Sequence, residues 1–539
     1  MPPQARNSAR SLREEGCLLA GVERAARVCH GTSTVMRPSA RVELDTRRDG
    51  RRVLVIGSGF GGLAAAVRLA ARGWRVTVLE RRDGPGGRAH AFQQDGFTFD
   101  AGPTVITCPH LLEELWALAG RKLADHVELK PVTPLYRMRF PDGVTFDYHT
   151  DKEAMLESVR RISPGDEAGY LSLSARVERM YEAGIGPLMS APVPHVLSLA
   201  PFTPALVRDE AFRSMYGLVS RHVKDERLRQ ALSFHPLLIG GSPFSPASAV
   251  YTSIQFVERR WGAFFPVGGT GALVRGMVSL LESLGGEVRY GSEVSEITVE
   301  GRKATGVRLG DGSWLPAEAV VSNADAAWTY RYLLPRHVRS HWTDTRIQQA
   351  RYSMSVFLWY FGTRRRYPEV AHHTLLFGRD FKGMFSGLAG PGLPSEDPLL
   401  YLHRPTATDV GLAPPDHDAF YVLAPVPHLG DGSSWKARAE IFRRKLAARL
   451  SRTVLPGLEQ ELVTSRVFTP EDFRDDLRSF RGAAFSFAPT LMQTTFLRAQ
   501  AKSEDVDRLY LVGAGTHPGA GLPAVLCSAK IVDTVMAGA

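Results

Sequence analysis

The sequence predicts an α/β protein with more than one lobe, and two stretches carry that prediction. Residues 53–80 have the pattern of an apolar strand, a glycine turn, an Ala/Leu-rich helix and a second apolar strand. Residues 265–325 have the pattern of a glycine turn, an amphipathic helix, short alternating strands and a final apolar strand. A chain of 539 residues is long enough to bury two or more cores.

The first stretch predicts a nucleotide-binding site of the Rossmann type. Val53–Ile56 is a continuous apolar run, as expected of a buried parallel strand, and Gly57, Gly59 and Gly62 follow it as G-x-G-x-x-G. Gly57 permits the tight turn, Gly59 lets the backbone approach a pyrophosphate at the helix N-terminus, and Gly62 lets helix and strand pack closely. Glu80 closes the second strand, where its carboxylate can accept both ribose hydroxyls and would repel the 2′-phosphate of NADP.

The next turn favours FAD over NAD. Gly86, Gly87 and Arg88 supply bare amides and a guanidinium that can hold the pyrophosphate from its other side. No second G-x-G-x-x-G follows a strand elsewhere, so we expect no separate pyridine-nucleotide domain. A flavin bound here is then expected to be reoxidised by a diffusing acceptor, oxygen or a quinone.

Composition excludes several other classes. The formal charge is +10, but 56 of the 66 basic residues are Arg, and no basic stripe interleaved with aromatics predicts nucleic-acid binding. The four cysteines form no CxxC pair, which predicts neither a disulfide framework nor a metal site and favours a reducing cytoplasm. No apolar run is long enough to span a bilayer, and residues 1–50 are expected to be a disordered tail.

The chain resembles the bacterial carotenoid desaturases of the phytoene desaturase family, in particular the lycopene-forming type. The resemblance covers most of residues 52–536 and rests on "GFTFDAGPTVIT" (96–107), "DERLRQALSFHPLLIGGSPF" (225–244), "WGAFFPVGGTGAL" (261–273), "YVLAPVPHLG" (421–430), "FRGAAFSFAPTLMQ" (480–493) and "LYLVGAGTHPGAGLPAVLCSAK" (509–530).

The resemblance implies a Rossmann-like FAD-binding domain, as in amine oxidases and glutathione reductase, with a discontinuous substrate domain and a helical membrane-associating part. The expected parts are FAD-binding segments at 51–150, 263–330 and 481–539, a helical substrate segment at 151–262 and a substrate domain at 331–480.

The resemblance also implies further site residues. Val294 is placed where a backbone hydrogen-bonds the adenine, although it can equally be a core valine. Gly513, Gly515 and Gly521 are expected to wrap the flavin end of the cofactor, with the following helix directing its N-terminus at the flavin ring. His517 in the same turn is either a catalytic base or a structural histidine, and no other catalytic side chain is assigned beside flavin N5.

Residues 155–260 and 335–480 are expected to form aromatic and Leu-rich helices around a long apolar tunnel for a C40 polyene. Within this part, residues 183–206 contain one ionisable residue, His195. This segment is either a buried helix hairpin or a surface half-inserted into lipid that draws carotene from the bilayer. We therefore expect a cytoplasmic protein peripherally associated with the cell membrane.

The function that the resemblance implies is FAD-dependent desaturation of phytoene, or of an intermediate such as zeta-carotene, towards lycopene. Hydride transfer to flavin leaves an allylic cation that then loses a proton, so the protein mainly supplies alignment. Three alternatives use the same scaffold: a redox-neutral carotene cis–trans isomerase, an amine or porphyrinogen oxidase, and a flavin-binding protein without activity.

Overall fold

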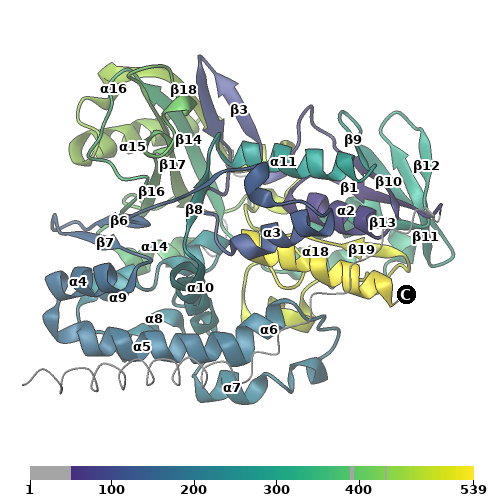
Figure 1. Ribbon diagram of the computed structural model, residues 1–539, viewed down its shortest axis with the longest axis horizontal. Helices are drawn as coiled ribbons and strands as arrows, with labels where there is room; N and C mark the ends of the chain where they lie inside the picture. The colour runs from purple at the N-terminus through teal and green to yellow at the C-terminus, as the bar shows by residue number, and fades with distance from the viewer. Residues whose placement is uncertain (1–49, 389–393, 431–433, 539) are drawn as a thin grey trace, which may run out of the picture. The chain divides into compact units, whose positions relative to one another are not determined.

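The computed structural model describes residues 50–388, 394–430 and 434–538, and its two main sheets are seen in Figure 1. The tail expected over residues 1–50 lies outside the described residues, apart from Gly50. The Rossmann-like α/β fold expected from the sequence is confirmed, because one of the two main sheets is wholly parallel and has helices covering one of its faces.

The parallel sheet has five strands in the order β19-β13-β1-β2-β9. Its strands come from three separated stretches of the chain: β1 (Arg52–Ile56), β2 (Arg75–Leu79), β9 (Glu287–Arg289), β13 (Ala319–Ser322) and β19 (Leu509–Leu511). In register, Val55 lies beside Val78 of β2 and Val321 of β13, and Val321 lies beside Tyr510 of β19. The central strand β1 thus pairs on one side with β13, which lies more than 200 residues further along the chain. On its other side it pairs with β2, the next strand in the sequence.

Both faces of this sheet are buried, which explains why its strands are continuous apolar runs. Val53 and Val55 point into a core shared with four helices, whereas Leu54 and Ile56 point into a core on the other face. The helices are α2 (Phe60–Ala71), α3 (Pro109–Leu118), α11 (Thr270–Ser283) and α18 (Leu522–Ala537). The opposite face is covered by the antiparallel strands β10 (Val294–Glu300), β11 (Lys303–Leu309) and β12 (Trp314–Pro316).

The second sheet has seven strands in the order β18-β14-β17-β16-β15-β6-β7. Those strands are β6 (Tyr136–Arg139), β7 (Thr145–Tyr148), β14 (Ser355–Thr363), β15 (His373–Leu376), β16 (Leu400–His403), β17 (Asp418–Val426) and β18 (Leu462–Phe468). The expectation of helices throughout 335–480 was therefore wrong. Residues 355–363 are buried along their whole length, so both faces are apolar and no alternation marks them as a strand.

The boundary expected at residue 150 also differs from the structure. β6 pairs in parallel with β15, and β7 completes the edge of the seven-stranded sheet. Met138 and Phe146 are buried in the core of that sheet, so residues 136–148 belong to it rather than to the first nucleotide-binding segment.

Short helices surround the two sheets. The stretch 152–261 contains α4 (Lys152–Ile162), α5 (Glu167–Met180), α6 (Gly186–Met189), α7 (Thr203–Arg208), α8 (Met215–Ser220), α9 (Glu226–Ala231) and α10 (Ser253–Trp261). Later helices are α12 (Ala326–Trp328), α13 (Asp344–Gln349), α14 (Phe381–Gly387), α15 (Ala439–Thr453), α16 (Leu458–Glu461) and α17 (Pro470–Asp475). The small strand pairs are β3 (Ala91–Gln94) with β4 (Phe97–Asp100), and β5 (Leu129–Pro131) with β8 (Phe264–Pro266).

The segment 183–206 does not form a buried hairpin. It consists of a π-helical turn, α6, a 3-10 turn and α7, and it leaves Val196 at 58% and Leu197 at 74% exposed. In the part of the chain that the structure describes, no helix combines the length and the apolarity needed to cross a bilayer.

Candidate flavin and substrate site

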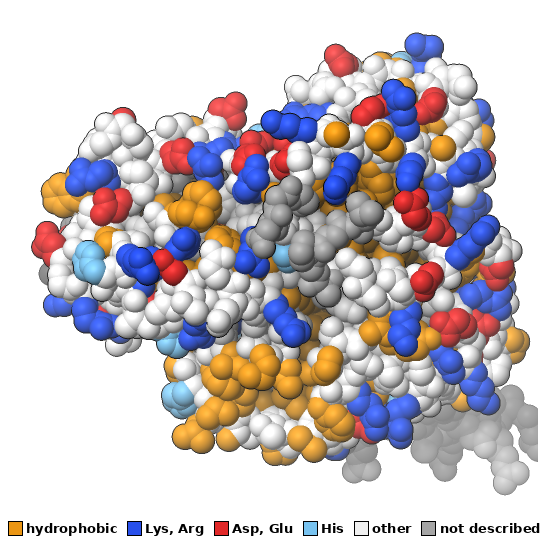
Figure 2. Space-filling model, turned by 180° about the vertical axis from the view of Figure 1, so that it is seen from behind, with side chains coloured by type: hydrophobic (Ala, Val, Ile, Leu, Met, Phe, Trp, Pro, Cys, Tyr) orange, Lys and Arg blue, Asp and Glu red, His pale blue; other side chains and the backbone are white. Residues whose placement is uncertain are grey.

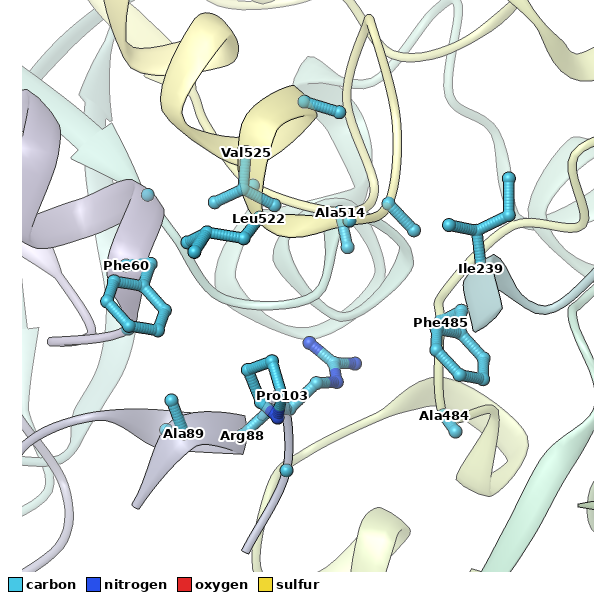
Figure 3. A pocket seen from close by; sticks show the side chains of 18 of the residues that line it. Phe60, Arg88, Ala89, Pro103, Ile239, Ala484, Phe485, Ala514, Leu522 and Val525 are labelled. Atoms are coloured by element: carbon cyan, nitrogen blue, oxygen red, sulfur yellow. The ribbon is translucent and has the colours of Figure 1, made fainter. Parts of the chain in front are cut away.

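One cavity of about 720 Å³ runs from the glycine turns of the parallel sheet into the space beneath the seven-stranded sheet. Figure 3 shows its middle section. Arg88, Ala89 and Pro103 line one side, and Leu522 and Val525 of α18 lie opposite them. A cavity of this size lies within the range of small-molecule and cofactor sites.

The first glycine turn closes tightly on itself. Gly57 has a φ of +90°, and its N–H donates to the Leu79 carbonyl at 2.8 Å, which joins the ends of β1 and β2. A Cβ on Gly62 would lie 2.1 Å from the Gly57 carbonyl oxygen, so the helix packs against the turn at a distance that only glycine allows. Gly59 is the N-cap of α2 and lines the cavity, and no side chain caps that helix. The N-terminus of α2 is therefore available to an anion in the cavity.

The Gly-Gly-Arg turn packs against the first turn. Gly86 bridges to Gly59 in a parallel pair, and its N–H donates to the Ser58 carbonyl at 3.0 Å. Gly86 and Gly87 both have positive φ values, +113° and +55°, and Gly87 lies against the Cα of Gly59. The two glycine turns thus form one continuous wall of bare backbone on the cavity.

Arg88 projects from this wall into the cavity (Figure 3). Its Nη2 donates to Ser479 Oγ at 2.7 Å and lies 3.9 Å from Asp325 Oδ2. Burial lowers the pKa of Arg88 from its ordinary value, and the Arg88 Nε and Asp325 Oδ2 atoms are buried without a partner among the described residues. Polar atoms in that state are expected to contact a bound group.

Glu80 lies at the end of β2 with its carboxylate anchored on the cavity wall. One oxygen accepts from both the N–H of Ser58 (2.9 Å) and its hydroxyl (2.6 Å), and the other accepts from the Arg82 N–H at 3.0 Å. Val294 lies nearby as the first residue of β10, and it lines the cavity while only 7% exposed. The backbone ties this corner together, because the Ser292 N–H donates to the Glu80 carbonyl at 2.8 Å.

The loop between β19 and α18 forms the opposite wall. Gly513 has a φ of +103°, and its N–H donates to Ser528 Oγ at 2.9 Å. A Cβ on Gly515 would lie 2.8 Å from that of Ala326, so this glycine is required by packing within the protein. Gly521 has a φ of +101°, lines the cavity and caps α18, whose N-terminus no side chain caps.

His517 in this loop has the contacts of a structural residue. It is 3% exposed, and its Nε2 lies 3.2 Å from the Leu188 carbonyl and 3.1 Å from the Ala191 carbonyl. Burial lowers the pKa of His517 to about 4, so the neutral ring donates from Nε2 to both carbonyls at neutral pH. His517 also lines the cavity, and its Nδ1 has no partner among the described residues. The ring therefore connects the loop between β19 and α18 to the segment around α6.

The far part of the cavity is apolar. Its walls include Leu188, Leu199, Leu206, Phe234, Val257 and Leu358. One carboxylate interrupts these walls: Glu258 is 1% exposed, accepts from the Tyr136 hydroxyl at 3.0 Å and lies 3.2 Å from His235 Nε2. Such a surface suits a long hydrocarbon better than a charged substrate.

Two residues that build the site were not singled out by the sequence analysis. Atoms of the Asn323 side chain lie within 2.9 Å of the position that a Cβ on Gly59, Gly61 or Gly513 would take. The Nδ2 atom of Asn323 donates to the Val512 carbonyl at 3.2 Å. Arg498 donates to the Ala514 carbonyl at 2.5 Å and thereby holds the loop between β19 and α18. Asn323 lies far in sequence from the glycines that it contacts, and no spacing rule connects either residue with its partners.

The comparisons with known proteins agree with this geometry. Residues 60–532 match the family described as flavin containing amine oxidoreductase, so the chain belongs to this family of flavin enzymes. Within the family the chain belongs to the phytoene desaturases, which confirms the resemblance found in the sequence. It is 44% identical to a lycopene-forming phytoene desaturase of Pantoea ananas, over 89% of this chain and 98% of that protein. It is 45% identical to a neurosporene-forming phytoene desaturase of Cereibacter sphaeroides, over 90% of this chain and 94% of that protein.

Solved structures support the fold. An oxidoreductase from Methanosarcina mazei superposes with a TM-score of 0.61 at 18% identity, over 90% of this chain and 100% of that one. A putrescine oxidase with bound putrescine gives a TM-score of 0.59 at 14% identity, over 91% and 99% of the two chains. At this identity the likeness extends to the architecture and not to the substrate.

Proposed function

We propose that the protein is an FAD-dependent desaturase that introduces double bonds into phytoene, or into a partly desaturated intermediate such as zeta-carotene, towards lycopene. The observation that carries this proposal is one continuous cavity that is lined at one end by a pair of glycine turns and at the other end mainly by apolar side chains. The family relationship to phytoene desaturases supports the same substrate class.

In this proposal, FAD occupies the cavity from the glycine turns to the loop before α18. Gly57, Gly59 and Gly62 form the pyrophosphate turn, with Gly87 and Arg88 on its other side. Glu80 holds the adenosine ribose, and the Val294 backbone holds the adenine. The unpartnered Arg88 Nε and the uncapped N-terminus of α2 fit an anionic group between them.

The flavin-side wall is formed by Gly513, Gly515 and Gly521. When bound, the flavin supplies a two-electron acceptor for a hydride from the substrate. The chain aligns the CH2–CH2 unit of a polyene in the apolar tunnel and keeps water away from it. We assign His517 to positioning, since its Nε2 is already engaged by two carbonyls of the α6 segment.

Spectroscopy tests the function directly. Purified protein with FAD should convert phytoene or zeta-carotene in liposomes to products that absorb at longer wavelength, because each new double bond extends the conjugated system. Conversion should require oxygen or a quinone as electron acceptor and should stop when both are removed. Turnover of prolycopene to another lycopene isomer, without consumption of an acceptor, would instead identify a carotene isomerase.

We further propose that the protein takes its substrate from a membrane surface. Within residues 196–212 and 491–492, six large apolar side chains are more than half exposed, and Figure 2 shows hydrophobic side chains gathered over the lower part of the face seen from behind. The six residues are Val196, Leu197, Val207, Phe212, Leu491 and Met492. Leu491 also lines the cavity, as do Leu199 and Leu206, so the apolar tunnel opens among these segments.

Replacing Leu197 and Met492 together by Asp should weaken binding to anionic liposomes at least about tenfold, because withdrawing one large apolar side chain costs roughly 1.5 kcal/mol or more. Liposome flotation measures the change. Ile441→Asp is the matched control, since Ile441 is 61% exposed but lies on α15 and does not line the cavity. Unchanged flotation of the double variant would show that this surface does not contact lipid.

A further inference from the structure

Three buried histidines meet at the ends of two neighbouring strands of the seven-stranded sheet. None of the three lines the cavity described above. His373 begins β15 and lies directly opposite His403, the last residue of the antiparallel strand β16. His372 precedes β15, and one ring nitrogen from each of the three residues lies within 4.8 Å of the others. His372, His373 and His403 are 5%, 0% and 1% exposed, so all three side chains are buried.

Hydroxyl groups lie within hydrogen-bond distance of the Nδ1 atoms of two of the three rings and so orient these rings. His372 Nδ1 lies 2.6 Å from Thr408 Oγ1, and His373 Nδ1 lies 2.7 Å from the Tyr401 hydroxyl. The Nε2 atoms of these two rings are left for the cluster, and His372 Nε2 lies 3.1 Å from His403 Nε2. Rings that are hydrogen-bonded through Nδ1 and converge through Nε2 have the arrangement of metal-ligating histidines.

The cluster is not satisfied by its own hydrogen bonds. His373 Nε2 and His403 Nδ1 are buried without a partner among the described residues. A buried polar atom that stays unpaired is costly, so the position of His373 Nε2 requires an explanation. A metal bound through the Nε2 atoms would pair His373 Nε2 and would leave His403 Nδ1 unchanged.

The positive charge beside the cluster is balanced by a buried carboxylate. Arg404 lies close to the cluster, and its positive charge alone would oppose the binding of a metal cation there. Its guanidinium is matched by Asp418, which accepts from Nε at 3.0 Å and from Nη2 at 3.2 Å.

We propose that His372, His373 and His403 form a zinc site. In tetrahedral coordination with Zn–N distances of about 2.0–2.1 Å, ligand nitrogens lie about 3.3 Å apart. The 3.1 Å separation of His372 Nε2 and His403 Nε2 fits that geometry, and His373 needs to approach by up to about 1.5 Å, the difference between 4.8 Å and about 3.3 Å. The three rings supply three of the four tetrahedral positions. Because the site is buried, the metal is acquired during folding rather than by exchange into the folded protein.

The metal would also order the tunnel wall. Zinc on Nε2 of His373 places the proton on Nδ1, which then donates to the Tyr401 hydroxyl. Tyr401 lies 2.8 Å from Thr104 Oγ1 and lines the cavity. The zinc site therefore fixes the direction of a hydrogen-bond chain that ends at the substrate tunnel.

The test is the metal content of the holoenzyme expressed in zinc-supplemented medium, after removal of any affinity tag. Elemental analysis should find about one zinc per chain, and His403→Asn should reduce it at least about tenfold. His428→Asn is the control: His428 is also buried, but it lies outside the cluster, and its removal should leave the zinc in place. Zinc retained in full by His403→Asn would place the metal elsewhere and overturn the proposal.

A second measurement covers a variant that fails to fold. Wild-type protein expressed with cobalt should show the visible ligand-field bands of tetrahedral Co²⁺ with nitrogen ligands, beyond the flavin absorption. Wild-type protein that contains neither stoichiometric zinc nor these bands would show that the histidines form a hydrogen-bonded cluster without metal.

Discussion

Gly59→Val should yield a folded protein that contains no flavin. Gly59 caps α2 and lines the cavity between the two glycine turns. A Cβ at this position would lie 2.8 Å from Asn323 Oδ1, and the two methyl groups of valine would extend into the space proposed for the pyrophosphate. Because Gly59 has a φ of −67°, valine adds bulk there without imposing a left-handed backbone.

Flavin absorbance per chain measures this result, with circular dichroism as the check on folding. We expect flavin content to fall at least about tenfold, since a backbone approach at a helix N-terminus tolerates no side chain. Gly165→Val is the matched control, because a Cβ there meets no atom within 4 Å and Gly165 does not line the cavity. Full yellow colour in the Gly59 variant would contradict the proposed cofactor position.

Gly521→Val should abolish desaturation, whereas His517→Ala should reduce it only modestly. Gly521 has a φ of +101° and caps α18 on the cavity, so valine should strain the backbone by about 1–3 kcal/mol and displace the wall that we propose lies beside the flavin. A displacement of about 1 Å in such a wall is enough to slow a reaction roughly 100-fold. A thermal melt should show that most of the Gly521 variant remains folded.

His517→Ala tests the other interpretation of the same loop. General acid–base catalysis contributes about 10²–10⁴-fold to a rate, so a loss within about tenfold would exclude His517 as the base. Any loss should be recovered in part by His517→Gln, which keeps an N–H donor for the Leu188 and Ala191 carbonyls. Elimination of turnover by His517→Ala with full flavin content would show that our structural interpretation is wrong.

The pH dependence gives an independent check on His517. Burial depresses the pKa of the His517 ring to about 4, so the ring stays neutral from pH 6 to 8. The rate of desaturation should therefore show no pH dependence from His517 in this range. Because the pKa of His517 is lower in the folded protein than in the unfolded chain, the unfolded chain binds more protons at this residue below about pH 6.5. The contribution of His517 to stability is therefore complete above that pH and is lost as the pH falls towards 4.

The nucleotide-binding half of the fold could be predicted because its signals are local. Gly57, Gly59 and Gly62 follow an apolar strand and begin a helix, and the structure places them in that turn. Val53–Ile56 was likewise predicted as a buried strand, and the structure has β1 over Arg52–Ile56. In each case neighbouring residues determine the backbone conformation, so spacing along the chain is sufficient.

The substrate half could not be predicted as well, because its strands carry no periodic pattern. Ser355–Thr363 is buried on both faces, and a continuous apolar run is equally compatible with a buried helix. Asn323 and the histidine cluster were missed for a different reason. Their partners are brought together only by tertiary packing, as when His373 meets His403 across two strands, and no local motif records that contact.

The pairing of β19 with β13, and of β13 with β1, has a consequence for biosynthesis. The first strand of the sheet emerges from the ribosome several hundred residues before the strand that completes it. Until residues 509–537 have been made, the loop between β19 and α18 is missing and the hydrophobic surfaces of α2 that face α18 stay uncovered. Nascent chains of this length hold exposed apolar surface for many seconds at usual translation rates of about 5–20 residues per second. The cofactor site that we propose is therefore complete only in chains that include α18, and shorter products are expected to be substrates for chaperones and proteases.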